Sequence, residues 1–167
     1  ARDLMGKATL TELAFLVVQR RMPTAEETRL FDAVLVSLAD HGLTPTVLSA
    51  RLTYTGAPES LQGAVAAGLL GGGSVFLGVV EDTVSFLDAA GDDVECAVAR
   101  ELEAGRRIPG LGHPIHKVED PRTPRIYAIA DETGLTGSYL TRLLQVAAAH
   151  SRQAGRDLPI NGAGVGG

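Results

Sequence analysis

The sequence predicts an all-α protein. Three observations lead to this fold class: a succession of amphipathic segments with helix-capping residues, proline or glycine at the breaks between them, and no segment with the two-residue alternation of a half-buried strand. The 167 residues suit one ordinary domain or two small lobes, and 45% of them are hydrophobic, which is enough for a core. Aromatic residues make up only 4%, so the core must consist mainly of Leu, Val, Ile and Ala.

The first half of the chain carries three predicted amphipathic helices. Thr9-Leu-Thr-Glu12 and Thr24-Ala-Glu-Glu27 are two capping boxes, separated by the helix-stopping Met22-Pro23. Thr44-Pro45 begins the third helix, with proline where a missing N–H costs least, and this helix should run to about Thr55. The apolar stripes of the first two helices are Leu10, Leu13, Ala14, Val17 and Val18, and Leu30, Phe31, Val34, Leu35 and Leu38, the second closed by Gly42.

The fourth predicted helix, residues 59–70, is apolar on nearly every side. A helix without a polar face must be buried all round, in the core of its own chain or against another subunit. Further helices are predicted over residues 79–90, 93–103, 123–132 and 138–154, the last with Leu140, Leu143, Leu144 and Ala147 facing inward. Residues 106–122 hold three prolines and two glycines without periodicity, which predicts a loop.

Composition and charge narrow the function classes. The net charge of −5 and a pI near 5.3 argue against nucleic-acid or anionic-membrane partners. Cys96 is the only cysteine, so an internal disulfide is impossible, and no zinc-type spacing is present, so no metal is expected. The most apolar run, Ala64–Leu70, is too short for a membrane span. These features favour a soluble protein of the reducing cytoplasm with no membrane partner.

The predicted loop is a basic island in an acidic chain. Between residues 106 and 125 it carries five basic side chains against only Glu119 and Asp120; the basic ones are Arg106, Arg107, Lys117, Arg122 and Arg125. Two histidines, His113 and His116, accompany them. Such an island suits a small polyanionic ligand, although a solvated loop whose arginines pair with neighbouring carboxylates has the same composition.

The order of residues in this loop is more specific than its charge. Arg-Arg-Ile-Pro-Gly-Leu-Gly-His-Pro-Ile-His-Lys over residues 106–117, followed by Asp120-Pro121-Arg122, resembles the signature of citrate synthases and citryl-CoA lyases. Residues 39–51, residues 61–73 and Leu158-Pro-Ile-Asn161 are similar to other segments of that family. The resemblance extends from about residue 4 to residue 166. It implies a multi-helical citrate synthase-like fold that apparently lacks the family's C-terminal helices.

The resemblance also implies a domain organisation. Residues 1–90 would form part of a large helical domain, with helices at about 45–71 that pair in a homodimer. Residues 91–155 would form a small domain that binds coenzyme A (CoA) and includes the 106–122 loop. Residues 156–167 would return toward the large domain.

Site residues follow from the resemblance, position by position. His113 matches the histidine that binds the carbonyl of oxaloacetate and donates a proton to its oxygen; His41 and Arg122 match binders of the substrate's carboxylates. CoA, as acyl-CoA substrate, would be contacted by Ile108, Pro109, Gly110, Leu111, Gly112, Lys117 and Asn161. From the residues alone, His41 could simply complement a helix dipole, and His116 could be a packed loop histidine.

Two of the family's usual catalytic positions differ in this chain. Phe76 stands where the family has the histidine that holds the thioester oxygen, and Ala163 where it has the proton-abstracting aspartate. The first hypothesis is a citryl-CoA lyase-type enzyme acting on an acyl-CoA and an oxo-acid, with Glu81, His116 or a residue beyond the end of the sequence handling the enolate. The alternative is a catalytically inactive homologue that binds CoA thioesters or regulates a relative.

Overall fold

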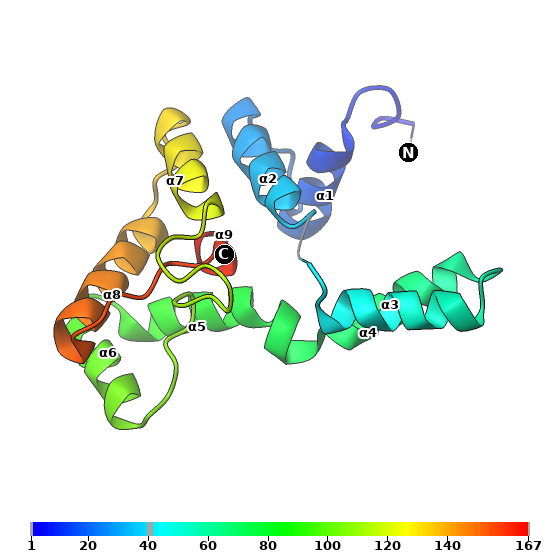
Figure 1. The fold of residues 1–167 in the computed structure, drawn as a ribbon. Coiled ribbons are helices and arrows are strands. Elements are labelled where there is room, and N and C mark those ends of the chain that lie inside the picture. The colour runs from blue at the N-terminus through cyan, green and yellow to red at the C-terminus, as the bar shows by residue number, and fades with distance from the viewer. Residues whose placement is uncertain (1, 40–41, 167) are drawn as a thin grey trace.

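The computed structural model describes residues 2–39 and 42–166, and within them the regular elements are helical. His41, predicted to bind substrate, lies outside the described residues. The helices are α1 (Leu10–Gln19), α2 (Ala25–Ser37), α3 (Pro45–Gly56), α4 (Leu61–Leu77), α5 (Val79–Ala90), α6 (Val94–Glu103), α7 (Arg122–Glu132), α8 (Ser138–Ala154) and α9 (Gly162–Gly166). The all-α prediction is confirmed, and Figure 1 shows the order of these helices in space.

Local signals set most helix boundaries. Both capping boxes form: each threonine hydroxyl accepts from the amide three residues on, and the glutamate there accepts from the threonine amide (Thr9 with Glu12, Thr24 with Glu27). Pro45 occupies the first turn of α3, as predicted. Helix α2 ends at Ser37, earlier than the predicted closure at Gly42. The short α9 was not predicted, because a Gly-Ala-Gly-Val-Gly sequence has little helix propensity of its own.

The core lies between α5, α6, α7 and α8, and the loop before α7 and the segment that ends in α9 also contribute to it. Its most buried members are Leu87, Val98, Leu143, Val146 and Ala149. Helix α2 packs on the outside of α7, and α1 packs on α2 through Phe15 and Phe31, whose rings meet edge to face at 5.5 Å. On α8, Leu143 is buried as predicted, whereas Leu144 is half exposed, so its inward assignment is wrong.

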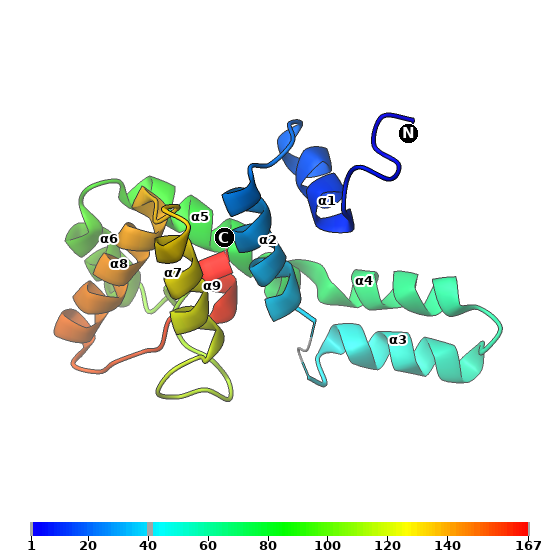
Figure 2. The ribbon, with the colours of Figure 1, turned by 90° about the horizontal axis from the view of Figure 1, so that it is seen from above.

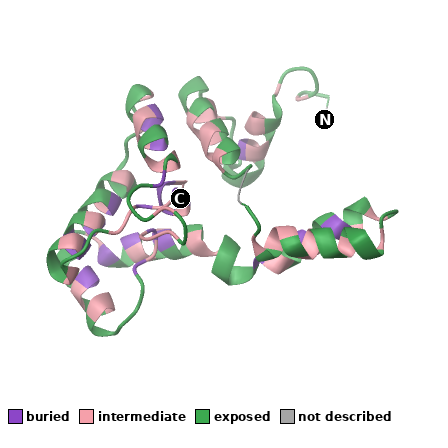
Figure 3. Ribbon diagram, in the orientation of Figure 1, coloured by how far each residue is buried: buried purple, intermediate pink, exposed green. Residues whose placement is uncertain are grey.

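Helices α3 and α4 form a hairpin that projects from this body as an arm (Figures 1 and 2). Its inner seam is made of small residues: a Cβ added at Gly68 would lie 3.2 Å from the Thr46 carbonyl oxygen, and one at Gly71 would lie 2.6 Å from the Ser49 hydroxyl. The prediction that the apolar helix of residues 59–70 is buried all round does not hold within one chain. Its large side chains are mostly exposed, and Figure 3 colours much of the arm as exposed.

The apolar run that begins in the arm changes one conclusion drawn from composition, namely that the chain has no apolar run long enough to span a membrane. Residues Leu61–Ala90 include an 18-residue window of mean hydropathy 1.8, of which 17% is buried. By length and composition this run could cross a membrane, so the expectation that the most apolar part of the chain is too short for a span is wrong. One such helix is weak evidence for a span, since core helices of soluble proteins have the same composition. Non-helical backbone at Gly73, with φ 52° and ψ −172°, interrupts the run.

Candidate active site

The loop predicted to carry the chemistry is held against the segment before α9. Leu111 and Ile160 form an antiparallel bridge, with the Gly112 amide donating to the Pro159 carbonyl at 2.7 Å and the Asn161 amide donating to the Gly110 carbonyl at 3.0 Å. Residues about 50 positions apart in the chain are thereby joined by backbone hydrogen bonds. The loop has no regular secondary structure of its own, but these bonds fix its course.

Two glycines allow the loop to take this course. Gly110 and Gly112 have φ values of 81° and 82°, the left-handed region that side chains disfavour. A Cβ at Gly110 would lie 3.0 Å from a methyl carbon of Thr83, a fully buried residue of α5. The Gly-Leu-Gly sequence therefore lets the loop turn twice and pack closely on α5, directly before His113.

His113 is oriented by the loop's own backbone. Its Nδ1 accepts hydrogen bonds from the amides of Ile115 (3.1 Å) and His116 (3.0 Å). An atom that accepts from two amides carries no proton, so neutral His113 holds its proton on Nε2. Its ring packs against that of His116, with centroids 4.6 Å apart. His113 can therefore offer an Nε2–H donor to a ligand oxygen.

Arg122 lies beside this histidine, at the start of α7. Its Nη2 is 3.4 Å from His113 Nε2, so the structure brings together two of the residues predicted to contact substrate. The guanidinium pairs with Asp120 through Nε (2.9 Å) and Nη2 (2.6 Å). Burial would raise the pKa of Asp120, but its hydrogen bonds from the Arg122 side chain, the Arg122 amide and the Gly162 amide outweigh burial and hold that pKa well below the usual range.

The residues predicted to bind CoA lie in the same loop, but they differ in accessibility. Ile108 is buried in the core, and Gly110 is buried too. Pro109, Leu111 and Gly112 are half-buried. Lys117 is exposed, and its ammonium donates to the His113 carbonyl at 3.0 Å.

Asn161 has a bridging position. Its side-chain amide donates to the Gly112 carbonyl at 2.9 Å, and its Oδ1 accepts from the Gly164 amide at 2.8 Å. Asn161 thus ties the loop to α9. The backbone groups of Gly110 and Gly112 named here are committed to this internal frame, which leaves the exposed side of the loop and Lys117 as its accessible part.

The positions that depart from the family's pattern hold apolar side chains. Phe76 is 42% exposed near the end of α4, and Ala163 is half-buried in α9. Glu81 is exposed in the first turn of α5. Among residues 2–39 and 42–166, no three His, Cys, Asp or Glu side chains come close enough together to hold a metal ion.

Sequence reasoning did not anticipate the part that Asp120 plays. The sequence presents it as an acidic residue of the basic loop and as part of the Asp-Pro-Arg signature, with no role assigned to its side chain, yet that side chain is fully buried and ion-paired with Arg122. The spacing Asp-Pro-Arg was the available signal, since a carboxylate two residues before an arginine that begins a helix can reach both the arginine side chain and its amide.

Comparison with solved structures supports the fold. Citryl-CoA lyase from Hydrogenobacter thermophilus superposes with a TM-score of 0.92 and 35% sequence identity, covering 99% of this chain and 66% of the other. ATP citrate lyase from Methanothrix soehngenii, solved in complex with citrate and coenzyme A, superposes with a TM-score of 0.82 at 24% identity, over 98% of this chain and 27% of that one. At that identity the second likeness concerns the fold alone.

Sequence relatives agree with this. Citrate synthase of Deinococcus radiodurans is 32% identical over 123 residues, and putative citrate synthase 2 of Mycobacterium tuberculosis is 32% identical over 136 residues. These matches cover 70% and 78% of this chain but only 33% and 36% of the relatives, so the chain spans about a third of their length. The family described as citrate synthase, C-terminal domain, matches residues 2–162. The chain belongs to the citrate synthase family.

Proposed function

We propose that this chain carries the carboxylate-binding half of a citryl-CoA lyase-type active site, which breaks or forms a carbon–carbon bond between an acyl-CoA and an oxo-acid. The observation that supports this most directly is the pairing of His113 and Arg122, 3.4 Å apart and each oriented by other groups of the protein. A neutral histidine donor beside a guanidinium suits an oxygen that gains negative charge next to a carboxylate.

The reaction assigns each group a task. In the cleavage direction, the bond between the hydroxyl-bearing carbon and the methylene next to the thioester breaks. The hydroxyl proton passes to water, the bond's electron pair moves onto the thioester as an enolate, and a proton from water then restores the methyl group. Synthesis is the reverse. In either direction His113 Nε2–H stabilises negative charge on the ketone-derived oxygen, while Arg122 holds the adjacent carboxylate.

A CoA thioester is the proposed partner substrate. The ATP citrate lyase neighbour was solved with citrate and coenzyme A, so ligands of this class accompany this fold in at least one relative. In this chain the exposed Lys117 ammonium, on the same loop as His113, is available to a CoA phosphate. We assign residues 108–112, in a small domain formed by residues 91–155, to the frame and wall of the same CoA site, and Asn161 reaches this site from the segment that follows that domain.

A catalytically inactive CoA-binding homologue is the second candidate. It is favoured by Phe76 and Ala163, because neither side chain can take or give the α-proton of the thioester. An enzyme with this sequence therefore requires another group to transfer the α-proton and stabilise the enolate. Glu81 and His116 are the candidates within the described residues. Of these, His116 is the one that packs directly on His113.

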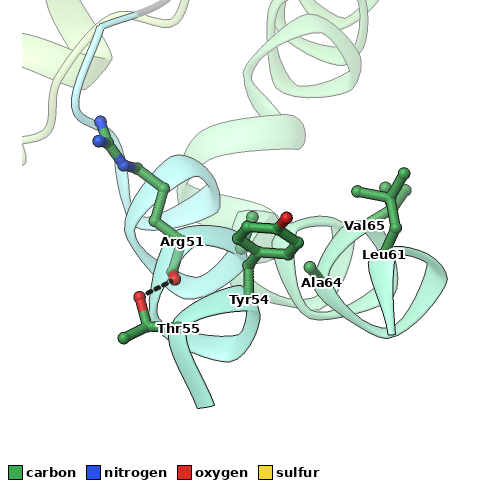
Figure 4. A pocket seen from close by; sticks show the side chains of 7 residues that line it. Arg51, Tyr54, Thr55, Leu61, Ala64 and Val65 are labelled. Carbon is green, nitrogen blue, oxygen red and sulfur yellow. Dashed lines mark hydrogen bonds between the residues drawn. The ribbon is translucent and has the colours of Figure 1, made fainter. Parts of the chain in front are cut away.

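We also propose that the arm pairs two copies in a homodimer. The outward face of α4 exposes Leu61 (65%), Val65 (56%), Leu69 (66%) and Leu70 (84%), while its small residues are used against α3. A hollow of about 350 Å³ opens between the two helices of the arm, and Figure 4 shows Arg51 and Tyr54 beside it. An apolar face of this kind marks an interaction surface. A cytoplasmic location, expected from the composition, stays a prediction.

Substitution of His113 by asparagine tests the enzymatic proposal. The Asn side-chain oxygen can still accept from the amides that now bond Nδ1, so the loop is preserved, but the Nε2–H donor is lost. We expect the full-length protein to cleave or form a citryl-CoA-type thioester, read by mass spectrometry of its products. His113→Asn should lower turnover by about 10²-fold or more, with CoA affinity nearly unchanged. Absence of turnover in the unmodified protein, with CoA still bound, would leave the inactive homologue as the function.

A further inference from the structure

We propose that Asp120 and Gly162 are positioning residues for Arg122: they commit one edge of its guanidinium to the protein and present the other edge to a ligand carboxylate beside His113. The inference deepens the proposed function and rests on it, because it takes the ligand to be a carboxylate. Its geometric basis is independent of that ligand. It lies in contacts between the loop, the start of α7 and the start of α9.

Asp120 is the fixed point of this arrangement. Its side chain is fully buried and accepts four hydrogen bonds. Three come from Arg122: the backbone amide (3.1 Å), Nε (2.9 Å) and Nη2 (2.6 Å). The fourth comes from the amide of Gly162 at 2.8 Å, which is 42 positions away along the chain. One carboxylate thus holds the arginine's backbone, its side chain and the beginning of α9 together.

Gly162 supplies the space in which the guanidinium lies. A Cβ built at this position would be 2.5 Å from Cζ of Arg122, 2.6 Å from Nε and 2.9 Å from Nη2. A Cβ carbon does not approach non-bonded atoms that closely, so any residue other than glycine would displace the guanidinium from its pairing with Asp120. The guanidinium therefore rests directly on the Gly162 backbone, with Asp120 along its edge.

The remaining donors of Arg122 define what the site can bind. A guanidinium has five N–H groups in a planar fork, and the pairing with Asp120 uses the Nε and Nη2 side. Within the described part of the chain, Nη1 has no hydrogen-bond acceptor, and the Arg122 side chain is 20% exposed. Nη2 also lies 3.4 Å from His113 Nε2. The ligand edge thus combines guanidinium donors with a histidine donor, which matches a carboxylate next to a carbonyl or hydroxyl oxygen.

Holding the arginine in this way affects binding strength. A free arginine side chain loses rotamer freedom when it binds a carboxylate, whereas this one is already ordered by Asp120 and Gly162. Loss of either positioning residue should weaken a carboxylate ligand without removing any group that touches it. CoA, bound through the exposed side of the loop, should be affected less.

A double-mutant cycle tests the steric part. Gly162→Ala should lower the urea midpoint of unfolding in the Arg122-containing protein, and the same substitution in an Arg122→Ala background should have little effect, because the clashing group is gone. Gly56→Ala is the matched control: a Cβ there meets nothing within 4 Å, and its φ is not left-handed. Equal destabilisation by Gly162→Ala in both backgrounds would overturn the proposed contact.

Binding measurements test the functional part, with citrate as the carboxylate probe and CoA as the reference ligand in calorimetry. We expect Gly162→Ala and Asp120→Asn each to weaken citrate about tenfold or more, and to change CoA affinity less than about threefold. Glu101→Gln is the control for Asp120→Asn. Glu101 of α6 forms a similar two-bond pair (2.7 and 2.8 Å) with Arg106, an exposed residue at the start of the loop, and its loss should leave citrate affinity unchanged.

The outcomes separate the inference from the function on which it rests. If the unmodified protein binds citrate and Gly162→Ala binds it equally well, the positioning role is refuted and the proposed function is untouched. If the unmodified protein binds no citrate, the assignment of a carboxylate ligand is refuted for both the positioning role and the proposed function. Selective loss of citrate binding in both variants, with CoA binding retained, supports both.

Discussion

Leu69→Ala is the sharpest test of the proposed pairing of arms. Leu69 lies on the outward face of α4 and is 66% exposed in one chain. The substitution removes carbon equivalent to three methylene groups, worth about 0.8 kcal/mol each when buried, or about 2.4 kcal/mol. If the partner subunit covers the exposed two thirds of the Leu69 side chain, the substitution removes about 1.6 kcal/mol of dimerisation free energy per subunit. A two-fold symmetric interface contains the residue twice, which gives about 3 kcal/mol.

Three kcal/mol corresponds to an increase of about 10²-fold in the dimer dissociation constant. Sedimentation velocity over a dilution series measures that constant for the unmodified and substituted proteins. Leu144→Ala is the matched control: this leucine of α8 is half exposed too, but it lies on the body rather than on the arm. It should leave the dissociation constant unchanged.

Three results would refute this reasoning. The first is an unmodified protein that sediments as a monomer at every concentration, which would mean that the apolar arm is not a self-association surface. The second is an equal dissociation constant for the unmodified protein and Leu69→Ala, which would place the dimer contact elsewhere. Loss of dimer by Leu144→Ala alone would move the interface to α8.

Three further outcomes are expected. Lys117→Glu should weaken CoA binding more than tenfold in calorimetry, whereas Lys7→Glu, a change to the chain's other lysine, should not. Burial, together with the charge of Arg156, lowers the pKa of His150, whose Nδ1 has no hydrogen-bond partner among residues 2–39 and 42–166. Its contribution to stability is therefore lost as pH falls below about 6.5, and His150→Leu should abolish that dependence in urea unfolding. The pKa of Asp120 is likewise lowered, so its contribution to stability is lost only below about pH 4. Asp120→Asn should therefore reduce the loss of stability below that pH in urea unfolding.

The helices themselves were largely predictable from sequence. Capping by Thr9 and Thr24, and the proline that opens α3, depend on residues within one turn of each other, and these local rules held. The closeness of His113 and Arg122 was predictable as well, since Gly-Leu-Gly-His and Asp-Pro-Arg lie in one short stretch of chain. Their proximity in space follows from sequence proximity.

Exposure was less predictable than helix position. The apolar stripe of α1 suggested an inward face, yet Leu10, Val17 and Val18 are mostly exposed and Phe15 is the buried residue. The apolar α4 was expected to be covered on all sides, and within one chain it is not. An apolar sequence indicates that a surface should be covered, but it does not indicate which element or partner covers it.

The sequence by itself determined the fold class, the order of helices and the loop that carries His113 and Arg122. Only the tertiary structure decided how the frame around those two side chains is assembled. Gly110 meets Thr83, Asp120 meets the Gly162 amide, and Asn161 closes on Gly112. Each contact joins residues 27 to 49 positions apart along the chain, where no local propensity acts. Long-range packing must bring such groups together before a buried carboxylate can orient an arginine.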